Sequence, residues 1–441
     1  MKMIRKKWRA AALIACLCAI FALLVPASAA EIPPLPDLSA AKVAYLYNID
    51  HDVALAEKGM NEKIFPSSTV KIMSGLVAVT ELAGRLDEEI TITAGMREDY
   101  YSIDFSLRVG DKLTVRDLLY LGFCGCYHDA IAVIEHIVAG GANGFVKLMN
   151  DRAAELGMEN TLYTNSTGVY DEKMYSTGAD IARLALAAQK STLYMTITSA
   201  PDYTPEGLKN YSDPSFNNRN YLVGRGRSKD YFNPVFRGMS AGQNASNEFN
   251  VVSVAVRDGV SYLVMVLGAP TDSEGRILSY VLASELAEWA FTSYGEVLLL
   301  ADSEIMGEIP VELGQDVSGV LVVPEESVST YDLLSLAGDM ERVRVSVKIT
   351  VPSLTAPVTA GTRVGTVTVL IDGEEYRTVP LVTKTGAARS KLDYFFSRIT
   401  SFARSRVFIA SVVAGAFYTL IYLIIRAKNK GKKKRSDYYL K

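Results

Sequence analysis

Two uncharged apolar segments, one near each end of the chain, constrain where the body of this protein can fold. The first runs from Ala10 to Val25, follows several Lys and Arg residues, and precedes small residues at 27–30. This pattern predicts a secretory signal peptide at residues 1–29, cleaved after Ala29 or Ala30. The rival interpretation of the same residues is an uncleaved anchor.

The second apolar segment, residues 407–425, is long enough to span a bilayer as a helix. A tail rich in Lys and Arg, residues 426–441, follows at once, and such clusters belong on the cytoplasmic side. The two ends therefore predict a cell-membrane protein whose body is extracytoplasmic and whose C-terminal tail is cytoplasmic.

Residues 387–406 precede this span and carry apolar side chains at helical spacing among basic ones. The apolar residues are Leu392, Phe395, Phe396, Ile399 and Phe402. The pattern predicts an amphipathic juxtamembrane helix that lies on the membrane surface. A simple helical extension of the span fits the same residues.

Charge and cysteine content narrow the class of protein further. The formal net charge is −3, and no basic patch lies outside the tail, which argues against nucleic acid as a partner. Of the four cysteines, two leave with the predicted signal peptide, and Cys124 and Cys126 are too close together to staple the fold. About 375 residues can build their cores without disulfides.

The mature chain is long enough for two domains, and its residue pattern changes near Ala301. Residues 30–298 read as strands, then a helical cluster, then strands again, which predicts an antiparallel sheet flanked by helices. The predicted strands are 43–47, 53–56, 251–256 and 262–267, and the predicted helices are 115–121, 129–138, 144–156, 178–188 and 277–291. Residues 299–386 are rich in Val, Thr and Gly, with apolar residues at alternate positions, which predicts a small all-β domain. One helical pattern interrupts it at 330–336.

The chemistry of the chain is concentrated in Ser68-Thr69-Val70-Lys71, placed where a helix should begin. Residues three apart on a helix share a face, so the Lys71 amine can reach the Ser68 hydroxyl. A helix N-terminus favours the alkoxide and the neutral amine, which makes the hydroxyl a nucleophile without histidine. The other interpretation is a helix cap followed by a solvated lysine.

Further segments give the chain a resemblance to the penicillin-binding D-alanyl-D-alanine carboxypeptidases of bacterial cell walls, from about Val43 to Thr383. The matching stretches are Leu156–Thr161, Tyr175–Asp180, Leu267–Pro270, Ala356–Gly361, Val364-Gly365, Asp372-Gly373 and Val379–Leu381. The resemblance implies an α/β domain of the β-lactamase/transpeptidase type, a small all-β domain and a C-terminal transmembrane helix. It also implies acyl transfer through an ester on Ser68, with Lys71 taking the proton, on peptidoglycan stem peptides. Penicillins and other β-lactams would acylate the same serine, and no cofactor is expected.

The second family motif, Ser-x-Asn before Asp-Ala, is altered in this chain. Cys126 stands at the serine position and His128 at the asparagine position, before Asp129-Ala130. The resemblance therefore implies a proton-relaying role for Cys126 and a substrate-binding role for His128. A thiol donates a hydrogen bond more weakly than a hydroxyl, and an imidazole cannot offer the donor and acceptor of an amide together.

The third family motif, Lys-Thr-Gly, reads Ser240-Ala241-Gly242, at a substrate-binding position on a strand. The lost lysine would hold the substrate carboxylate, a contact worth roughly 1.5–3 kcal/mol. Arg237 points to the opposite face of the strand unless a bulge intervenes. We interpret the literal Lys384-Thr385-Gly386 as coincidence because it lies in the predicted small β-domain.

Cys124, Cys126 and His128, with His136 nearby, also fit a metal site by residue type. Zinc needs three or four ligands, and no second pair lies close in sequence, so we expect no metal.

Two functions remain open on the sequence. The first is a serine carboxypeptidase, slow or altered in specificity. The alternative is a catalytically weak or inactive penicillin-binding protein that serves as a cell-wall-binding scaffold. A β-lactamase is less well supported, because no extra base for deacylation can be located.

Overall fold

The computed structural model describes residues 33–96, 107–208, 211–226, 230–244, 246–336 and 339–436. The predicted signal peptide lies outside these residues. The chain divides between Gly295 and Glu296 into two compact units.

The first unit is built on a five-stranded sheet in the order β2-β1-β11-β10-β9, with every neighbouring pair antiparallel. The predicted hairpins are confirmed, and Asp258-Gly259 form the turn between β10 and β11, both at positive φ. The strands of this unit are β1 (Val43–Asn48), β2 (Val53–Lys58), β3 (Lys63–Ile64), β4 (Glu89–Thr91), β5 (Lys112–Thr114), β6 (Ser176–Thr177), β7 (Asp202–Tyr203), β8 (Phe216–Asn217), β9 (Phe236–Gln243), β10 (Phe249–Arg257) and β11 (Val260–Ala269).

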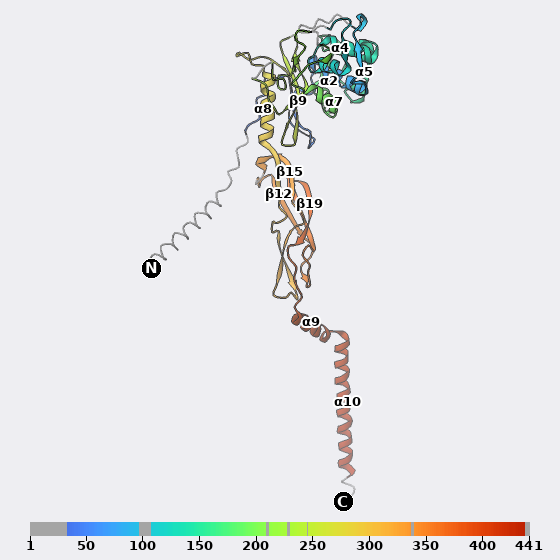
Figure 1. Cartoon of the computed structure of the whole chain (residues 1–441). Coiled ribbons are helices and arrows are strands. Elements are labelled where there is room, and N and C mark those ends of the chain that lie inside the picture. Colours follow the sequence, from blue (N-terminus) through green and yellow to red (C-terminus); the bar gives the residue numbers. More distant parts are fainter. Residues whose placement is uncertain are drawn as a thin grey trace, which may run out of the picture. The chain divides into compact units, whose positions relative to one another are not determined.

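Helices cover both faces of this sheet. The five predicted helices are confirmed as α3 to α6 and α8, the helix expected to begin at the Ser68 motif is α2, and α7 joins them. The helices are α2 (Val70–Leu82), α3 (Val115–Phe123), α4 (His128–Ala139), α5 (Ala142–Glu155), α6 (Gly178–Ala188), α7 (Thr192–Thr198) and α8 (Leu278–Ser293). In Figure 1, α2, α4, α5 and α7 gather on one side of β9 and α8 lies on the other.

The period of two along β11 divides the apolar side chains between two cores. Leu263, Met265 and Leu267 pack with the helical cluster of α2 to α7. The alternate residues, from Tyr262 to Val266, pack with α8. The sheet is therefore buried on both faces, which fixes the position of β9 against α2.

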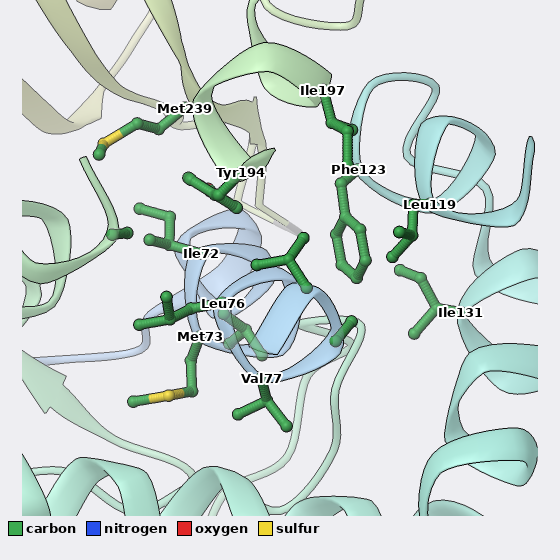
Figure 2. Close-up of a cluster of buried hydrophobic side chains, with 14 of the residues drawn as sticks. Ile72, Met73, Leu76, Val77, Leu119, Phe123, Ile131, Tyr194, Ile197 and Met239 are labelled. Carbon is green, nitrogen blue, oxygen red and sulfur yellow. The ribbon is translucent and has the colours of Figure 1, made fainter. Parts of the chain in front are cut away.

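Helix α2 runs through the middle of the larger core. Its apolar side chains point in several directions, toward Phe123, Tyr194 and Ile131 from three other helices (Figure 2). A helix that is apolar around most of its circumference belongs in a protein interior. Its two exposed residues, Thr80 and Glu81, lie in the last turn.

The second unit is a small all-β structure followed by two helices. Its six-stranded sheet has the order β16-β18-β19-β14-β13-β17, and β12 pairs with β15. Valine, leucine and isoleucine side chains from these strands form its core. The elements are β12 (Tyr294–Leu300), β13 (Gly307–Glu312), β14 (Gly319–Pro324), β15 (Val328–Leu333), β16 (Val343–Ile349), β17 (Leu354–Thr355), β18 (Arg363–Ile371), β19 (Glu374–Thr383), α9 (Lys391–Ala403) and α10 (Arg406–Ser436).

The helix predicted at 330–336 is wrong. Strand β15 continues to Leu333, and only a 3-10 turn, Leu334–Leu336, follows it. The leucine spacing resembled a helical stripe, but pairing with β12 and burial of Val328 favour the extended chain.

The C-terminal helices match the apolar patterns of the sequence. The stretch Arg406–Lys428 of α10 is long and apolar enough to cross a membrane. Helix α9 is capped by the Ser390 side chain and leaves Phe395, Phe396 and Phe402 exposed. Since α9 ends at Ala403 and α10 begins at Arg406, the segment is not a continuous extension of the span.

The Ile72→Ala variant is expected to lower the free energy of unfolding of the first unit by about 2–5 kcal/mol, because Ile72 is fully buried and the cavity left behind refills only in part. Trp289 fluorescence during urea unfolding measures this, since the other tryptophan, Trp8, lies in the predicted signal peptide. The matched control Glu81→Ala, exposed on the same helix, is expected to change stability by less than about 0.5 kcal/mol. Equal losses in the two variants would contradict the central position of α2.

Candidate active site

Ser68 lies in a 3-10 turn, Ser67–Thr69, that leads directly into α2. Thr69 Oγ1 donates to the Pro66 carbonyl oxygen over 2.7 Å, and Ser67 has a φ of +49°, in the left-handed region. The N-cap residue of α2 is Thr69, which makes no side-chain capping bond, and Ser68 Oγ bonds to none of the described residues, so the cap interpretation of this serine is wrong. The Ser68 hydroxyl is therefore not used in building the helix.

A cavity of about 530 Å³ opens beside this turn. Six of the seven predicted site residues line it: Ser68, Lys71, Cys126, His128, Ala241 and Gly242. They come from the 3-10 turn before α2, from α2 itself, from the loop before α4, from the start of α4, and from β9. Thr167 to Tyr170, Arg219, Tyr221 and Tyr280 complete most of the wall. The structure therefore brings six of the seven predicted residues to one cavity, and Ser240 is the exception.

The Lys71 amine is held from across the cavity. Its Nζ donates to the Thr167 carbonyl oxygen over 2.6 Å. Burial lowers the pKa of Lys71; the Cys126 thiol opposes this shift and the Arg219 guanidinium adds to it. These effects favour the neutral amine, the form that can accept a proton.

The predicted hydrogen bond between Ser68 and Lys71 is not formed. Ser68 Oγ is buried and has no hydrogen-bond partner among the described residues. Both groups nevertheless face the same cavity. A buried hydroxyl without a partner is costly, so its place in a residue that lines a cavity indicates a group kept available for another molecule.

Two glycines let neighbouring segments approach Ser68 closely. A Cβ on Gly242 would lie 2.7 Å from Ser68 Cβ, so only glycine lets β9 pass this near the hydroxyl. Gly168, with a φ of +80°, lies against the Ser67 carbonyl on the other side. The close approach of β9 to Ser68 therefore explains why glycine stands at position 242.

The altered second motif lies on a strained turn. Cys126 has a φ of +59°, which costs a non-glycine residue of order 1–3 kcal/mol and is typical of functional sites. His128 is the first residue of α4. Burial, and then the nearby Lys71, lower the pKa of His128 to about 4. The imidazole is therefore neutral at neutral pH and can donate one hydrogen bond.

Ser240 points away from the cavity. Its Oγ donates to the Ser68 carbonyl oxygen over 2.7 Å, and the residue is buried. Ser240 is therefore a tie between β9 and the Ser68 turn. The predicted direct role of Ser240 in binding substrate does not follow from this position.

Arg237 does not reach the site either. A bulge does interrupt the pairing of β9 and β10 between Val252 and Val254. The Arg237 guanidinium nevertheless donates to the carbonyl oxygens of Pro234 and Phe236, over 2.6 and 2.7 Å. The expectation that it cannot replace the lost lysine agrees with this arrangement.

Arg219 is the cavity residue that sequence reasoning missed. Its Nε donates to the Gly125 carbonyl oxygen over 3.2 Å, beside the altered second motif. Its neighbours Asn218 and Asn220 are buried, and their amides donate to Thr198, Ala200 and Gly238 carbonyl oxygens. A basic residue between two asparagines, ahead of the strand with the third motif, was the available signal.

No cluster of three or more metal-ligating side chains occurs in the part of the chain that the structure describes. Cys124 is buried and donates to the Ala200 carbonyl oxygen over 3.4 Å. This arrangement agrees with a packing role for Cys124.

Comparison with known families gives two matches. Residues 29–271 match the family described as D-alanyl-D-alanine carboxypeptidase, and residues 294–388 match the family described as Penicillin-binding protein 5, C-terminal domain. One match lies in the first unit, and the other covers the β-structure of the second.

Individual relatives agree with these matches. The D-alanyl-D-alanine carboxypeptidase DacF of Bacillus subtilis is 25% identical over 360 residues, which covers 81% of this chain and 88% of the relative. The D-alanyl-D-alanine endopeptidase of Pseudomonas aeruginosa is 30% identical over 187 residues, 42% of this chain and 56% of the relative.

Among solved structures, penicillin binding protein 6B from Escherichia coli has a TM-score of 0.55 at 19% identity, covering 80% of this chain and 98% of that one. Penicillin binding protein 5 from Haemophilus influenzae has a TM-score of 0.54 at 21% identity, covering 81% of this chain and 100% of that one. At these identities the two structures show a shared fold.

The rate of Ser68 acylation by a labelled penicillin is expected to rise with pH along a titration whose midpoint lies below 10.5, the ordinary value for lysine. The sign follows from burial: it disfavours the ammonium, so the proton-accepting amine is already present at a lower pH than in free lysine. His128, with a pKa of about 4, contributes only at acid pH.

Single-turnover labelling between about pH 5 and pH 11 measures this profile. Circular dichroism at each pH confirms that the fold is intact. A midpoint at or above 10.5, or a rate that falls as pH rises, would contradict the assignment of Lys71 as the base.

Proposed function

The chain belongs to the D-alanyl-D-alanine carboxypeptidase family, and from this premise we propose that it is a serine-type D-Ala-D-Ala carboxypeptidase acting on peptidoglycan stem peptides. The observation that carries the proposal is the Ser68 hydroxyl, which is buried, bonds to no group in the described ranges, and belongs to a residue that lines one cavity with Lys71.

In the first step, Ser68 Oγ attacks the carbonyl between the two D-alanines and Lys71 takes the hydroxyl proton. A neutral amine has two N–H groups and one lone pair. Because one N–H is donated to the Thr167 carbonyl, the amine is oriented while its lone pair stays available. The amine must still move to reach Ser68 Oγ.

The tetrahedral intermediate needs donors for its oxyanion. The Ser68 backbone N–H is one candidate. The second is a backbone N–H of β9, the edge strand that passes the nucleophile at Gly242. The terminal D-alanine then leaves, and water hydrolyses the ester on Ser68.

Cys126 lies close enough to Lys71 for each to influence the other electrostatically. In the proposed mechanism its thiol passes the proton from Lys71 to the leaving amine, more weakly than a hydroxyl would. The neutral His128 donates one hydrogen bond to the bound peptide. Both substitutions predict slower turnover than the unaltered motif would give.

Arg219 takes over the carboxylate-binding role that the third motif has lost. It brings a permanent positive charge to the cavity wall, whereas Ser240 and Ala241 bring none. A guanidinium presents several N–H groups in a fork that matches a carboxylate. The substrate's free terminus would therefore bind beside Gly125 and Arg219.

The experiment that tests the proposed function compares two reactions of the full-length protein: labelling by penicillin and release of D-alanine from a peptide ending in D-Ala-D-Ala. Both are expected, and both are expected to vanish in Ser68→Ala because the ester cannot form. Ser273→Ala, at an exposed serine away from this cavity, is the matched control and should retain labelling. Labelling that persists in Ser68→Ala would sink the proposal.

Arg219→Gln is expected to lower kcat/KM for a peptide with a free C-terminal carboxylate about ten- to a hundred-fold, the size of a lost charge-assisted contact. The same peptide with a C-terminal amide is expected to change little. The exposed Arg225→Gln serves as the control. Equal losses with the acid and the amide would indicate that Arg219 only supports the Gly125 loop.

A second candidate function, a wall-binding protein with little turnover, is favoured by two observations. Ser68 and Lys71 are not hydrogen-bonded, and Ala241 supplies no hydroxyl. Penicillin labelling without D-alanine release would identify a substrate trap. The absence of both reactions would identify a scaffold.

We further propose that the protein is anchored in the cell membrane by α10, with the first unit outside the cytoplasm and the basic tail inside. The apolar stretch Arg406–Lys428 and the charge pattern that follows it support this arrangement. The exposed aromatic residues of α9 support its position on the membrane surface.

A further inference from the structure

Strand β16 forms one edge of the six-stranded sheet in the second unit. Among the described residues, β18 is the one strand that pairs with it. The other edge of β16 therefore carries backbone N–H and C=O groups that no described strand takes up. The strand has seven residues, which is long enough for an added strand to pair along it.

The apolar inner face of the sheet continues onto β16 but is not closed there. Val345 and Val347 lie opposite two valines of β18 that are fully buried. Val345 and Val347 are themselves each 41% exposed, and Ile349 is 38% exposed. The core of this unit thus ends at the open edge in a stripe of three partly uncovered, branched apolar side chains.

The outer face of the same strand is basic. Arg344 and Lys348 alternate with the apolar stripe, and both are exposed. No ion pair holds either cation in the part of the chain that the structure describes. Four residues of extended chain separate them by about 13 Å. The outer face therefore presents two unmatched positive charges.

Edge strands in soluble proteins usually carry a feature that prevents pairing, such as an inward-pointing charge, a proline or a bulge. The segment Val343–Ile349 contains no proline, and its pairing with β18 runs without a register shift. Its charges lie on the outer face and leave the inner stripe uninterrupted. The edge is therefore open to pairing, and the charges restrict which strand can pair.

A second copy of β16 is a poor match for this edge. When two identical edge strands pair antiparallel across a two-fold axis, their outer faces lie on the same side of the joined sheet. Arg344 and Lys348 of both copies would then share one face, and like charges on neighbouring strands are destabilising. The basic face favours a partner that brings carboxylates instead.

The spacing of the two cations also distinguishes an extended partner from a helical one. Carboxylates four residues apart span about 13 Å on a strand but only about 6 Å on a helix. A strand can therefore match Arg344 and Lys348 together while its backbone pairs with β16. A helix offers neither the spacing nor free backbone groups.

The Ile349 end of the edge opens into a cavity of about 440 Å³. Ile309 and Pro310 of β13 line this cavity with Ile349, so it has room for an apolar side chain of the partner. Glu308 lines the same cavity, which disfavours a further carboxylate there. The acidic pattern of the partner must end before this point.

We propose that the open edge of β16 binds an extended segment of a partner protein in which acidic and apolar residues alternate. The partner's backbone continues the sheet, its apolar side chains cover Val345 and Val347, and its carboxylates lie beside Arg344 and Lys348. This site belongs to the second unit and requires no acylation of Ser68.

The test measures the binding of three fluorescent eight-residue peptides to the full-length protein in detergent, by fluorescence anisotropy. One alternates valine and glutamate, one alternates valine and lysine, and one has four glutamates followed by four valines. We expect the alternating glutamate peptide to bind about tenfold more tightly than either of the others, because it alone places carboxylates beside both cations. Equal affinity for the three peptides, or no binding of the alternating glutamate peptide, would overturn the proposal.

A charge reversal locates the effect on β16. Lys348→Glu is expected to weaken the alternating glutamate peptide about three- to tenfold and to strengthen the alternating lysine peptide, since the cross-strand pairs change sign. Lys384→Glu, at an exposed lysine after β19 whose backbone bonds to β14, is the matched control and should change neither. Circular dichroism confirms that both variants are folded. If the two reversals have the same effect, the peptides bind elsewhere and the proposal fails.

Sedimentation of the protein without peptide tests the other occupant of this edge. We expect no association through β16. A dimer that Lys348→Glu strengthens would place a second copy there, because the new carboxylate would lie near Arg344 of that copy, and it would overturn the proposal. None of these readouts depends on turnover at Ser68, so their failure leaves the proposed function unaffected.

Discussion

The hydrogen bond from Lys71 Nζ to the Thr167 carbonyl oxygen is the contact on which the catalytic cavity depends. It ties the first turn of α2 to a loop 96 residues later in the chain. It also gives a buried amine a partner that does not require a positive charge. An ammonium in this position would need a carboxylate to offset its desolvation, and a carboxylate would bring the pKa back up. A backbone carbonyl avoids that conflict, which is why the loop matters chemically.

That loop is itself fixed by buried polar contacts. Ser166 Oγ donates to the carboxylate of Glu135 on α4, and Asn165 Oδ1 accepts from the backbone N–H groups of Thr167 and Gly168. Because Ser166, Thr167 and Glu135 are buried and the polar contacts of the loop are formed, the Thr167 carbonyl has little freedom to turn away. The same helix also positions the second motif, because α4 begins at His128 and carries Glu135 two turns later. One helix therefore positions both a cavity wall and the support of the base.

Local patterns predicted the elements well, and contacts between distant segments could not be predicted from them. Helix α6 has the predicted bounds, Gly178–Ala188, because its apolar spacing is uninterrupted and Thr177 accepts from the Asp180 N–H. The failure at 330–336 arose because pairing with β12 outweighs a local leucine pattern. In the site, the resemblance placed Ser68, Lys71, Cys126 and His128 at one cavity. It could not predict the hydrogen bond from Lys71 to Thr167, the hydrogen bond from Ser240 to the Ser68 carbonyl, or the place of Arg219 in the cavity wall. Each of these depends on how segments without periodicity fold onto the core.

The altered third motif is best understood as a separation of two roles that one strand position would otherwise combine. Ser240 retains the mechanical role, since its hydroxyl bonds the Ser68 carbonyl and holds β9 against the nucleophile turn. The positive charge comes instead from Arg219, on a segment anchored by two buried asparagines. The guanidinium also opposes protonation of Lys71, which favours the neutral amine that the proposed mechanism needs. In the proposed mechanism, a substrate carboxylate bound beside Arg219 would neutralise that effect in part and raise the proton affinity of Lys71 when the amine must accept a proton. In the proposed mechanism, carboxylate recognition and base strength are therefore coupled through a single arginine.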